Sequence, residues 1–370
     1  MPRKVMRNVH LWLGLTSGLL VFVIAITGCL YAFREEIENL TQPYRFVKPQ
    51  SKRFLCPSEL KQIATDSLSG LPLHSIHYPG TGRAAEAIFY RNEPEGYLKV
   101  FIHPYDGRIL KVKDMNRGFF AFVLDGHFYL WLPHEIGQPV VASATLIFTV
   151  LLITGIILWW PRNPNAVKQR FCIRWNTRWR RKAYDLHNVL GFYASWIVIF
   201  MALTGLVWGF EWFSKTVYAV ASGGREMMPY QLPLSDTTRT TGATIPAIDR
   251  VWEMLSQEAP QGASIEVHIP ETNTASVAAG INPHPGTYWQ TDYRYFDQHT
   301  LKELPVNHIW GRINEASAAD KIMRMNYDIH VGAIGGLPGK FIAFFASLIV
   351  ASLPITGILV WWGRKRKRKT

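Results

Sequence analysis

Four stretches of the chain contain no charged residue, and each is 22 or 23 residues long: 11–33, 139–160, 188–210 and 341–362. About 20 residues of helix cover a hydrocarbon core of roughly 30 Å. A cleaved signal peptide has a shorter apolar core of about 7–15 residues, so we interpret the first stretch as a retained helix. The pattern predicts an α-helical membrane protein with a bundle of four transmembrane helices.

The two long connections, 34–138 and 211–338, have a different pattern. Each contains a helix-like stretch, 57–69 or 246–258, followed by alternating apolar positions typical of strands, at Ala87–Tyr90, Tyr97–Ile102, Ser276–Ala279 and Tyr293–Phe296. Asp106–Leu110 has the composition of a turn. We therefore predict two separate α+β lobes. Aromatic residues over 118–134 favour an interfacial helix, and residues 221–245 favour a linker.

The chain also repeats its own pattern. A His-x-x-x-Gly motif begins at His10 and again at His187, and a Thr-Gly pair follows 17 residues after each of these histidines. A second Thr-Gly motif, ending in two tryptophans, lies in 153–160 and again in 355–362, and an Asp-x-His precedes each, ending at His127 and His330. These matches predict two tandem repeats.

Charge predicts the orientation in the membrane. The net charge is +13, and the basic residues concentrate in 1–10, 161–187 and 363–370, where few acidic residues offset them. The positive-inside rule then places both termini and the loop 161–187 in the cytoplasm. The predicted order is helix 1–33, outer lobe 34–138, helix 139–160, cytoplasmic loop 161–187, helix 188–210, outer lobe 211–338, and helix with basic tail 339–370. This arrangement indicates a multi-pass membrane protein whose two long connections lie outside the cytoplasm, and it argues against nucleic acid as a partner.

Several kinds of site are excluded by motif. The three cysteines form no C-x-x-C pair and no C-x-x-C-H, so the sequence has no signature for covalently attached c-type haem, zinc or iron–sulfur ligation. No P-loop, G-x-G-x-x-G or H-E-x-x-H occurs. Nucleotide or flavin chemistry would therefore belong to a separate electron donor.

The matched histidines are the strongest candidates for chemistry. If the repeats are related by an axis along the membrane normal, His10 faces His187 on the cytoplasmic side and His127 faces His330 on the outer side. Two facing imidazoles are the axial ligands that b-type haem needs, so we expect two haem b groups, one near each face. His134 is an alternative to His127. The other interpretation of these histidines, as ordinary interfacial anchors, stays open.

Basic side chains near the same ends are candidates for haem propionates. They are Arg7, Arg181 or Lys182 on the inner side, and Arg117 or Arg324 on the outer side. The threonines of the Thr-Gly pairs are expected to bond their own helix backbone or a neighbouring helix.

Over nearly its whole length the chain resembles the PepSY-associated transmembrane proteins of bacteria. The likeness rests on the ordered recurrence of His-x-x-x-Gly, an apolar span with Thr-Gly, a helix-plus-strands lobe, and a His before a second Thr-Gly span ending in Trp. In size and doubled layout it is most similar to the FoxB-type inner-membrane ferric siderophore reductases. The family's Asp-Pro-x-Thr-Gly turn is irregular here, at His103–Gly107 and Asp297–Leu301.

The resemblance implies two PepSY-like lobes and an oxidoreductase that reduces ferric siderophores at the periplasmic side, with electrons from a cytoplasmic donor or a quinol. Two alternatives remain open. One is a haem-free, membrane-anchored PepSY protein that binds or regulates a partner, and the other is a transmembrane electron carrier to a different acceptor.

Overall fold

The chain divides into two compact units in the computed structural model, which describes residues 3–366 except 69, 92–95, 162–166, 168–169 and 240–243. The helical unit comprises Met1–Arg34, Phe119–Val217 and Asn326–Thr370, and the sheet unit comprises Glu35–Gly118 and Tyr218–Met325. Parts of the predicted basic loop 161–187, of the linker 221–245 and of the basic tail therefore lie outside the described residues.

Four helices of the helical unit are long and apolar enough to cross a membrane within the described part of the chain, as predicted. They are α1 (Arg3–Ala32), α5 (His134–Trp159), α8 (Gly191–Gly209) and α13 (Gly336–Arg366). α8 continues from α7 (Trp179–Asp185) through a π-helical turn, η2 (Leu186–Leu190). The helices α1, α5 and α13 begin several residues before their uncharged stretches, because backbone hydrogen bonds continue through the flanking polar residues.

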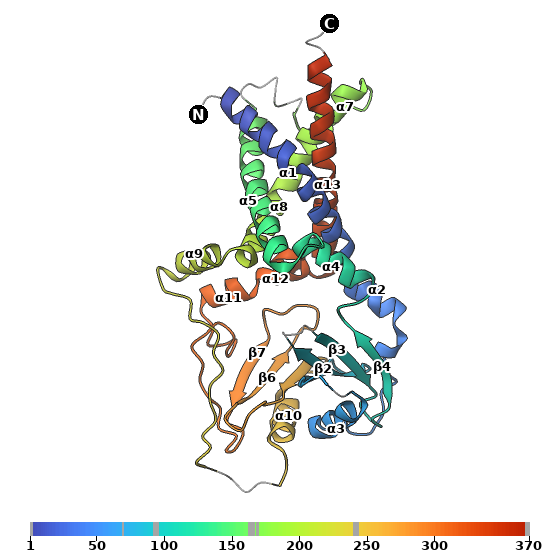
Figure 1. Ribbon diagram of the computed structural model, residues 1–370, viewed down its shortest axis with the longest axis vertical. Coiled ribbons are helices and arrows are strands. Elements are labelled where there is room, and N and C mark those ends of the chain that lie inside the picture. Colours follow the sequence, from blue (N-terminus) through green and yellow to red (C-terminus); the bar gives the residue numbers. More distant parts are fainter. Residues whose placement is uncertain are drawn as a thin grey trace. The chain divides into compact units, whose positions relative to one another are not determined.

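The four long helices pack in a ring in which α1 and α8 each contact both α5 and α13 (Figure 1). Small side chains let the helices approach closely in the middle of the bundle. Buried residues there are Val21, Ala25, Leu152, Ala194, Val198, Ala202, Ala346, Val350 and Ala351. The bundle is therefore tightly packed by small and aliphatic side chains halfway along its length, and polar side chains occur nearer its two ends.

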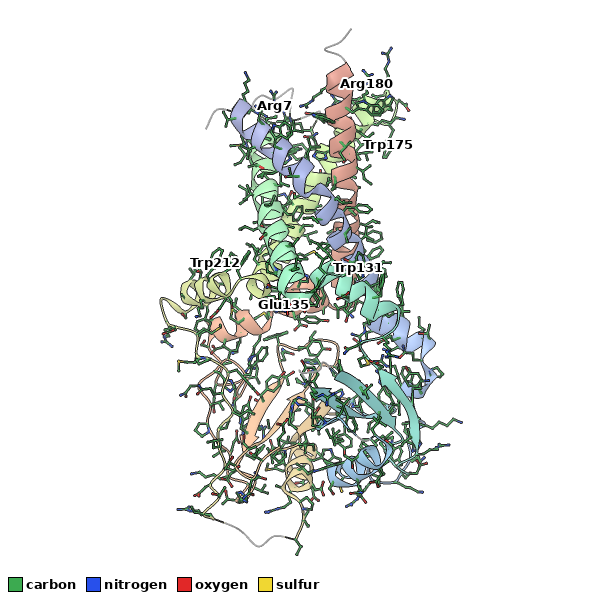
Figure 2. The ribbon with its side chains drawn as sticks, viewed as in Figure 1. Arg7, Trp131, Glu135, Trp175, Arg180 and Trp212 are labelled. Carbon is green, nitrogen blue, oxygen red and sulfur yellow. The ribbon has the colours of Figure 1, made fainter. Side chains whose placement is uncertain are left out.

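Two short helices lie at the end of the bundle where α1 finishes and α13 begins. α4 (Phe119–Tyr129) packs on α1 and α5, and α12 (Asn326–His330) packs on α8. The Nδ2 group of Asn326 donates to the carbonyl of Thr204 at 3.1 Å and ties α12 to α8. Figure 2 shows Trp131, Glu135 and Trp212 at this end of the helical unit, and Arg7, Trp175 and Arg180 at the opposite end.

The sheet unit contains one antiparallel sheet of seven strands in the order β4-β3-β2-β1-β5-β6-β7. The strands are β1 (Leu73–Tyr78), β2 (Ala85–Arg91), β3 (Gly96–Ile102), β4 (Ile109–Asp114), β5 (Ser264–His268), β6 (Val277–Asn282) and β7 (Asp292–Phe296). Each long connection forms a helix followed by antiparallel strands, as predicted, but the two predicted lobes share a single sheet. The two long connections each supply half of the sheet and join where β1 pairs with β5, with Ile76 opposite Val267.

Helices cover one face of this sheet. α3 (Pro57–Ser67) and α10 (Ala247–Glu258) pack on alternate apolar residues of the strands, as the sequence pattern predicts. Ile109 and Leu110 do not continue the predicted turn but begin β4. The remaining elements are α2 (Arg34–Thr41), η1 (Pro43–Arg45), α9 (Glu211–Ser222), α11 (Ala318–Arg324) and η3 (Ala333–Gly335).

The opposite, open face of the sheet carries a buried ion pair. The Nζ group of Lys99 on β3 lies 2.7 Å from Oε2 of Glu86 on β2, and the two side chains are 18% and 6% exposed. Burial alone would raise the pKa of Glu86, but Lys99 and His77 outweigh it and hold that pKa far below its ordinary value. Glu86 therefore stays charged, and the buried carboxylate needs the charge of Lys99 to offset the cost of its burial.

Replacing Lys99 by Met should expose this dependence. Removing one partner of a buried ion pair leaves an uncompensated charge and costs about 3–5 kcal/mol. Hydrogen exchange followed by mass spectrometry should show faster exchange in β2 and β3, while α5 keeps its protection. Lys111→Met, at an exposed position on β4, is the matched control. Unchanged exchange in Lys99→Met would show that the pair contributes nothing.

The same pair predicts a pH dependence of the wild-type sheet. Because the pKa of Glu86 is lower in the folded than in the unfolded chain, its contribution is complete above the ordinary glutamate pKa of about 4.3 and is lost as the pH falls below it. Protection of β2 and β3 should decrease in that acidic range and should not decrease between pH 6 and 8.

Candidate functional site

The first pair of facing imidazoles lies at the end of the bundle where α1 begins and α13 finishes, and we call it the terminus-side pair. His10 is on α1 and His187 is in the π-helical turn η2. Their ring centroids are 6.5 Å apart and the rings are nearly perpendicular, at 86°. π-helical turns are rare and occur frequently at functional sites, because they redirect one side chain without ending the helix.

The second pair lies at the opposite end of the bundle, and we call it the loop-side pair. His127 is near the end of α4 and His330 is the last residue of α12. Their ring centroids are 6.1 Å apart, with 67° between the ring planes. Short helices packed on the bundle thus present these histidines, whereas the terminus-side pair belongs to the long helices themselves.

All four imidazoles are held in the same way. In each case Nδ1 is within hydrogen-bond distance of the hydroxyl of a Thr-Gly threonine on another helix. The pairs are His10 with Thr154 at 2.9 Å, His187 with Thr356 at 3.1 Å, His127 with Thr27 at 3.2 Å, and His330 with Thr204 at 3.0 Å. The Thr-Gly recurrence in the sequence is therefore a recurrence of imidazole-binding positions.

Backbone carbonyls determine which ring nitrogen carries the proton. Nδ1 of His127, His187 and His330 also lies 2.9–3.1 Å from a carbonyl oxygen one helical turn before the threonine. A carbonyl only accepts, so Nδ1 is the donor. Thr154 donates its own proton to its helix at Val150, so Nδ1 of His10 donates as well. Nε2 of each neutral ring consequently keeps its lone pair for a ligand.

The glycine of each Thr-Gly motif makes room for the ring. A β-carbon at these positions would lie 3.2–3.5 Å from the imidazole Cε1 atom. The pairs are Gly28 with His127, Gly155 with His10, Gly205 with His330, and Gly357 with His187. The threonine thus orients the ring, and the absent side chain of the next residue lets the ring lie directly on the helix.

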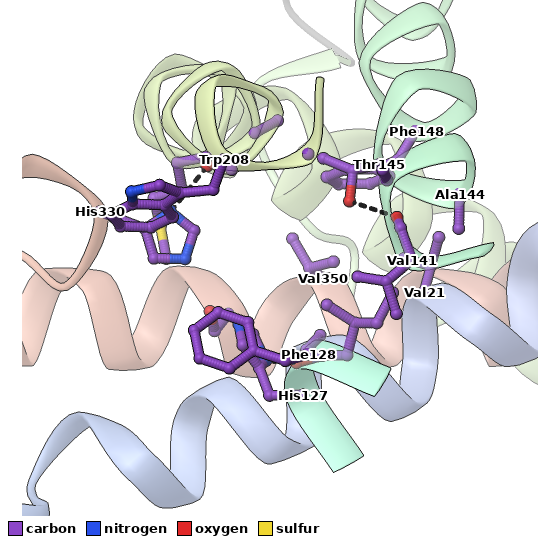
Figure 3. A pocket seen from close by; sticks show the side chains of 18 of the residues that line it. Val21, His127, Phe128, Val141, Ala144, Thr145, Phe148, Trp208, His330 and Val350 are labelled. Atoms are coloured by element: carbon purple, nitrogen blue, oxygen red, sulfur yellow. Dashed lines mark hydrogen bonds between the residues drawn. The ribbon is translucent and has the colours of Figure 1, made fainter. Parts of the chain in front are cut away.

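A cavity opens beside the loop-side pair (Figure 3). His127, His330, Phe128 and Trp208 line it, its volume is about 140 Å³, and it is partly open to the outside. Small residues from the long helices complete the wall: Ala25, Ala142, Ala144, Ala202, Gly205 and Gly209. The cavity is therefore mostly apolar, and its polar lining consists of the two imidazoles with Gln138, Thr145 and Ser347.

The spacing of both pairs fits a metal held between two imidazoles. A metal–imidazole bond is about 2.0–2.1 Å and the ring centre lies roughly 1 Å further, which places the two centroids about 6–6.5 Å apart. No group of three or more His, Cys, Asp or Glu side chains is arranged to hold a metal in the part of the chain that the structure describes. A metal at either pair would thus take its other ligands from a cofactor such as a porphyrin.

Burial keeps the loop-side imidazoles neutral. It lowers the pKa of His330 to about 4, with a further decrease caused by the neighbouring His127. It also lowers the pKa of His127, although the carbonyl of Ile24 opposes the change. Both rings are therefore uncharged at neutral pH, which is the form that ligates metals.

Of the two candidates for the loop-side position, the structure brings His127 and not His134 opposite His330. His134 is the first residue of α5, its side chain is exposed, and it packs beside Tyr129. His134 begins a long helix, whereas α4 lays His127 against Thr27 of α1. The matched Asp-x-His positions of the two repeats favour His127 over His134 in the sequence as well.

The predicted propionate partners have different surroundings. Arg7 is exposed, and Arg181 pairs with the buried Asp185 at 2.9 Å. Arg324 is only 2% exposed, and its three nitrogen atoms donate to the carbonyls of Ile309, Thr291 and Gly311 in the sheet unit. The expectation that Arg324 binds a propionate is therefore wrong, because its guanidinium is committed to the backbone. Arg117 is 86% exposed and pairs with Asp114.

The family model described as "PepSY-associated TM region" matches residues 7–364. The chain belongs to this family. No curated protein matches it. The match starts before His10 and ends at residue 364, inside α13, so it includes both histidine pairs and the four Thr-Gly threonines of this PepSY-associated membrane protein.

Removing one threonine hydroxyl should loosen one imidazole without changing side-chain size. Thr204→Val leaves Nδ1 of His330 with only the carbonyl of Met201. Loss of such an outer partner typically weakens metal binding by about 10–100-fold. A haem ligated by His330 would therefore transfer faster to excess apomyoglobin from Thr204→Val than from the wild type.

Thr149→Val is the matched control, because Thr149 is equally buried but bonds only its own helix, at the carbonyl of Thr145. Equal rates of haem loss in the two variants would contradict a special role for Thr204.

Proposed function

We propose that this PepSY-associated membrane protein binds two b-type haems, one at each histidine pair, and is an oxidoreductase that reduces siderophore-bound ferric iron. The observation that carries the proposal is the fourfold arrangement of an imidazole, a threonine hydroxyl and a glycine. An interfacial anchor needs none of these contacts. An axial ligand needs all of them, since its tautomer and its ring orientation must both be set.

The residues of the chain have separable roles toward the haems. Nε2 of His10 and His187 would ligate one iron and Nε2 of His127 and His330 the other, while the threonines hold the opposite ring nitrogens. Apolar side chains around the loop-side cavity would pack against the macrocycle. Arg7, at the end of the bundle that carries the terminus-side pair, is free to meet a propionate in water. When bound, haem supplies one-electron chemistry, and its axial ligands and surroundings tune the potential.

The separation of the pairs supports a role across the membrane. His10 and Thr27, the latter holding His127, are 17 residues apart on α1, which corresponds to a rise of about 25 Å. His187 and Thr204 have the same separation. Two cofactor positions near opposite ends of the bundle are what electron transfer through a membrane requires, and the recurrence is expected of two tandem repeats.

The direction and the substrate rest on the sequence. The positive-inside rule places the termini in the cytoplasm and the sheet unit in the periplasm of the inner membrane, with a cytoplasmic donor or a quinol supplying electrons. Siderophore oxygens are hard ligands that hold Fe(III) far better than Fe(II), so reduction loosens the metal and aids uptake. Because β1 and β5 join the two halves of the sheet, the chelate does not dock between separate lobes.

Alanine substitutions test the haem assignment. His10→Ala and His330→Ala should each reduce the haem content of the purified protein by about half, because each removes an axial ligand from one of two independent sites. A pyridine haemochrome measurement per mole of protein gives the count. His134→Ala is the control and should keep both haems. If His10→Ala and His330→Ala also keep both haems, the ligand assignment is incorrect.

Proteoliposomes test the reaction. With reductant enclosed and a ferric trihydroxamate chelate outside, the wild type should produce Fe(II), detected with a coloured Fe(II) chelator, and His10→Ala should fall to the rate of protein-free vesicles. Haem-loaded protein that reduces other acceptors but not the chelate would overturn the substrate in favour of an electron carrier. Protein that folds without haem would overturn the proposal in favour of an anchored binding protein.

A further inference from the structure

The open face of the sheet holds a second cavity, separate from the bundle. Polar side chains of several strands line it, among them His74, His77, Lys99, Glu266, His268 and Asn282. Here ionisable groups from β1, β2, β3 and β5 meet at the line where the two halves of the sheet join.

A β-bulge turns His74 into this cavity. The pairing of β1 with β2 shifts register between Leu73 and Ser75. Leu73 and Ile76 pack into the core under the helices, whereas Ser75 bonds Glu266 on the open face. Both His74 and Ser75 therefore lie on the open side, which regular alternation would not allow. Bulges commonly re-aim a side chain in this way near functional sites.

The re-aimed His74 meets His268 of β5. Nε2 of His74 lies 3.2 Å from Nδ1 of His268, and the rings are perpendicular, with centroids 4.8 Å apart. Two nitrogens bound to one metal at about 2.0–2.1 Å, with an angle between 90° and 109°, are about 2.9–3.4 Å apart. The distance between these two nitrogens therefore suits a shared metal as well as a shared proton.

We propose that His74 and His268 chelate a divalent first-row transition-metal cation, with the borderline-soft character of Zn²⁺, Cu²⁺ or Ni²⁺ that imidazole prefers. Glu266 precedes His268 by two residues on the same face, and its carboxylate accepts a hydrogen bond from Oγ of Ser75 at 2.6 Å. It adds negative charge beside the imidazoles. Lys99, the nearest cation among the cavity residues named, is engaged by Glu86.

The site has two protein ligands and open positions. Among the described residues no third His, Cys, Asp or Glu is close enough to complete a cage. Water, or a chelator that arrives with the metal, would fill the other positions. Such a site binds reversibly, unlike a structural zinc site with four protein ligands. The site does not depend on the haem proposal, because all of its residues belong to the sheet unit.

Equilibrium dialysis of the full-length protein against Zn²⁺, purified without a polyhistidine tag, tests the site. Elemental analysis counts zinc separately from haem iron. The wild type should bind one zinc that His74→Gln and His268→Gln each lose, with affinity reduced at least tenfold. His284→Gln, at an exposed position in the same unit, should bind zinc like the wild type. Identical zinc binding in all four proteins would overturn the proposal.

Copper provides a readout that does not depend on how well the variants fold. Electron paramagnetic resonance of the wild type with one equivalent of Cu²⁺ should show coupling to two imidazole nitrogens, and His268→Gln should show one at most. A copper spectrum without nitrogen coupling in the wild type would contradict the chelate.

Discussion

The structure of the bundle depends on a hydrogen bond that recurs at four places, from Nδ1 of an imidazole to the hydroxyl of a threonine on another helix. In an apolar bundle an imidazole without a partner would cost several kcal/mol. The threonine satisfies one ring nitrogen, and among the described residues no hydrogen bond to the other ring nitrogen is found. An imidazole with one bonded and one unbonded ring nitrogen adds little to the stability of a core, but it is suited to binding a ligand.

The rest of the helical unit follows from placing these rings. Glycine follows each threonine, and at Gly28 and Gly357 a β-carbon would crowd the ring of His127 or His187. Small residues must line the bundle near the loop-side pair, or no cavity remains beside His127 and His330. The packed middle of the bundle, around Leu152 and Ala194, then holds the helices at a fixed separation. The packed residues that stabilise the bundle lie between the two histidine pairs, and the candidate ligand-binding residues lie near its two ends.

The sequence predicted the parts that depend on local pattern. Four spans follow from hydropathy, and the helices α3 and α10 from apolar periodicity. The single sheet was missed because pairing of β1 with β5 joins residues almost 200 positions apart, and no local pattern records which strand edges meet. Arg324 was misassigned because an arginine that satisfies backbone carbonyls has the same sequence context as an exposed one.

The role of the Thr-Gly pairs was visible in the sequence only as a recurrence. A threonine in a long helix commonly bonds its own backbone, and these threonines do so as well. The second contact, to an imidazole on another helix, depends on the tertiary fold. The spacing of 17 residues is the same from His10 to Thr27 and from His187 to Thr204. This equality indicates that the histidines and the Thr-Gly pairs belong to the same repeated unit.

The most direct test of the account is the absorption spectrum of the purified wild-type protein, expressed with ample haem, together with its haem-to-protein ratio. The account predicts a Soret band, the α and β bands of reduced low-spin b-type haem, and a ratio of about two. Folded protein that shows no Soret absorption would contradict it.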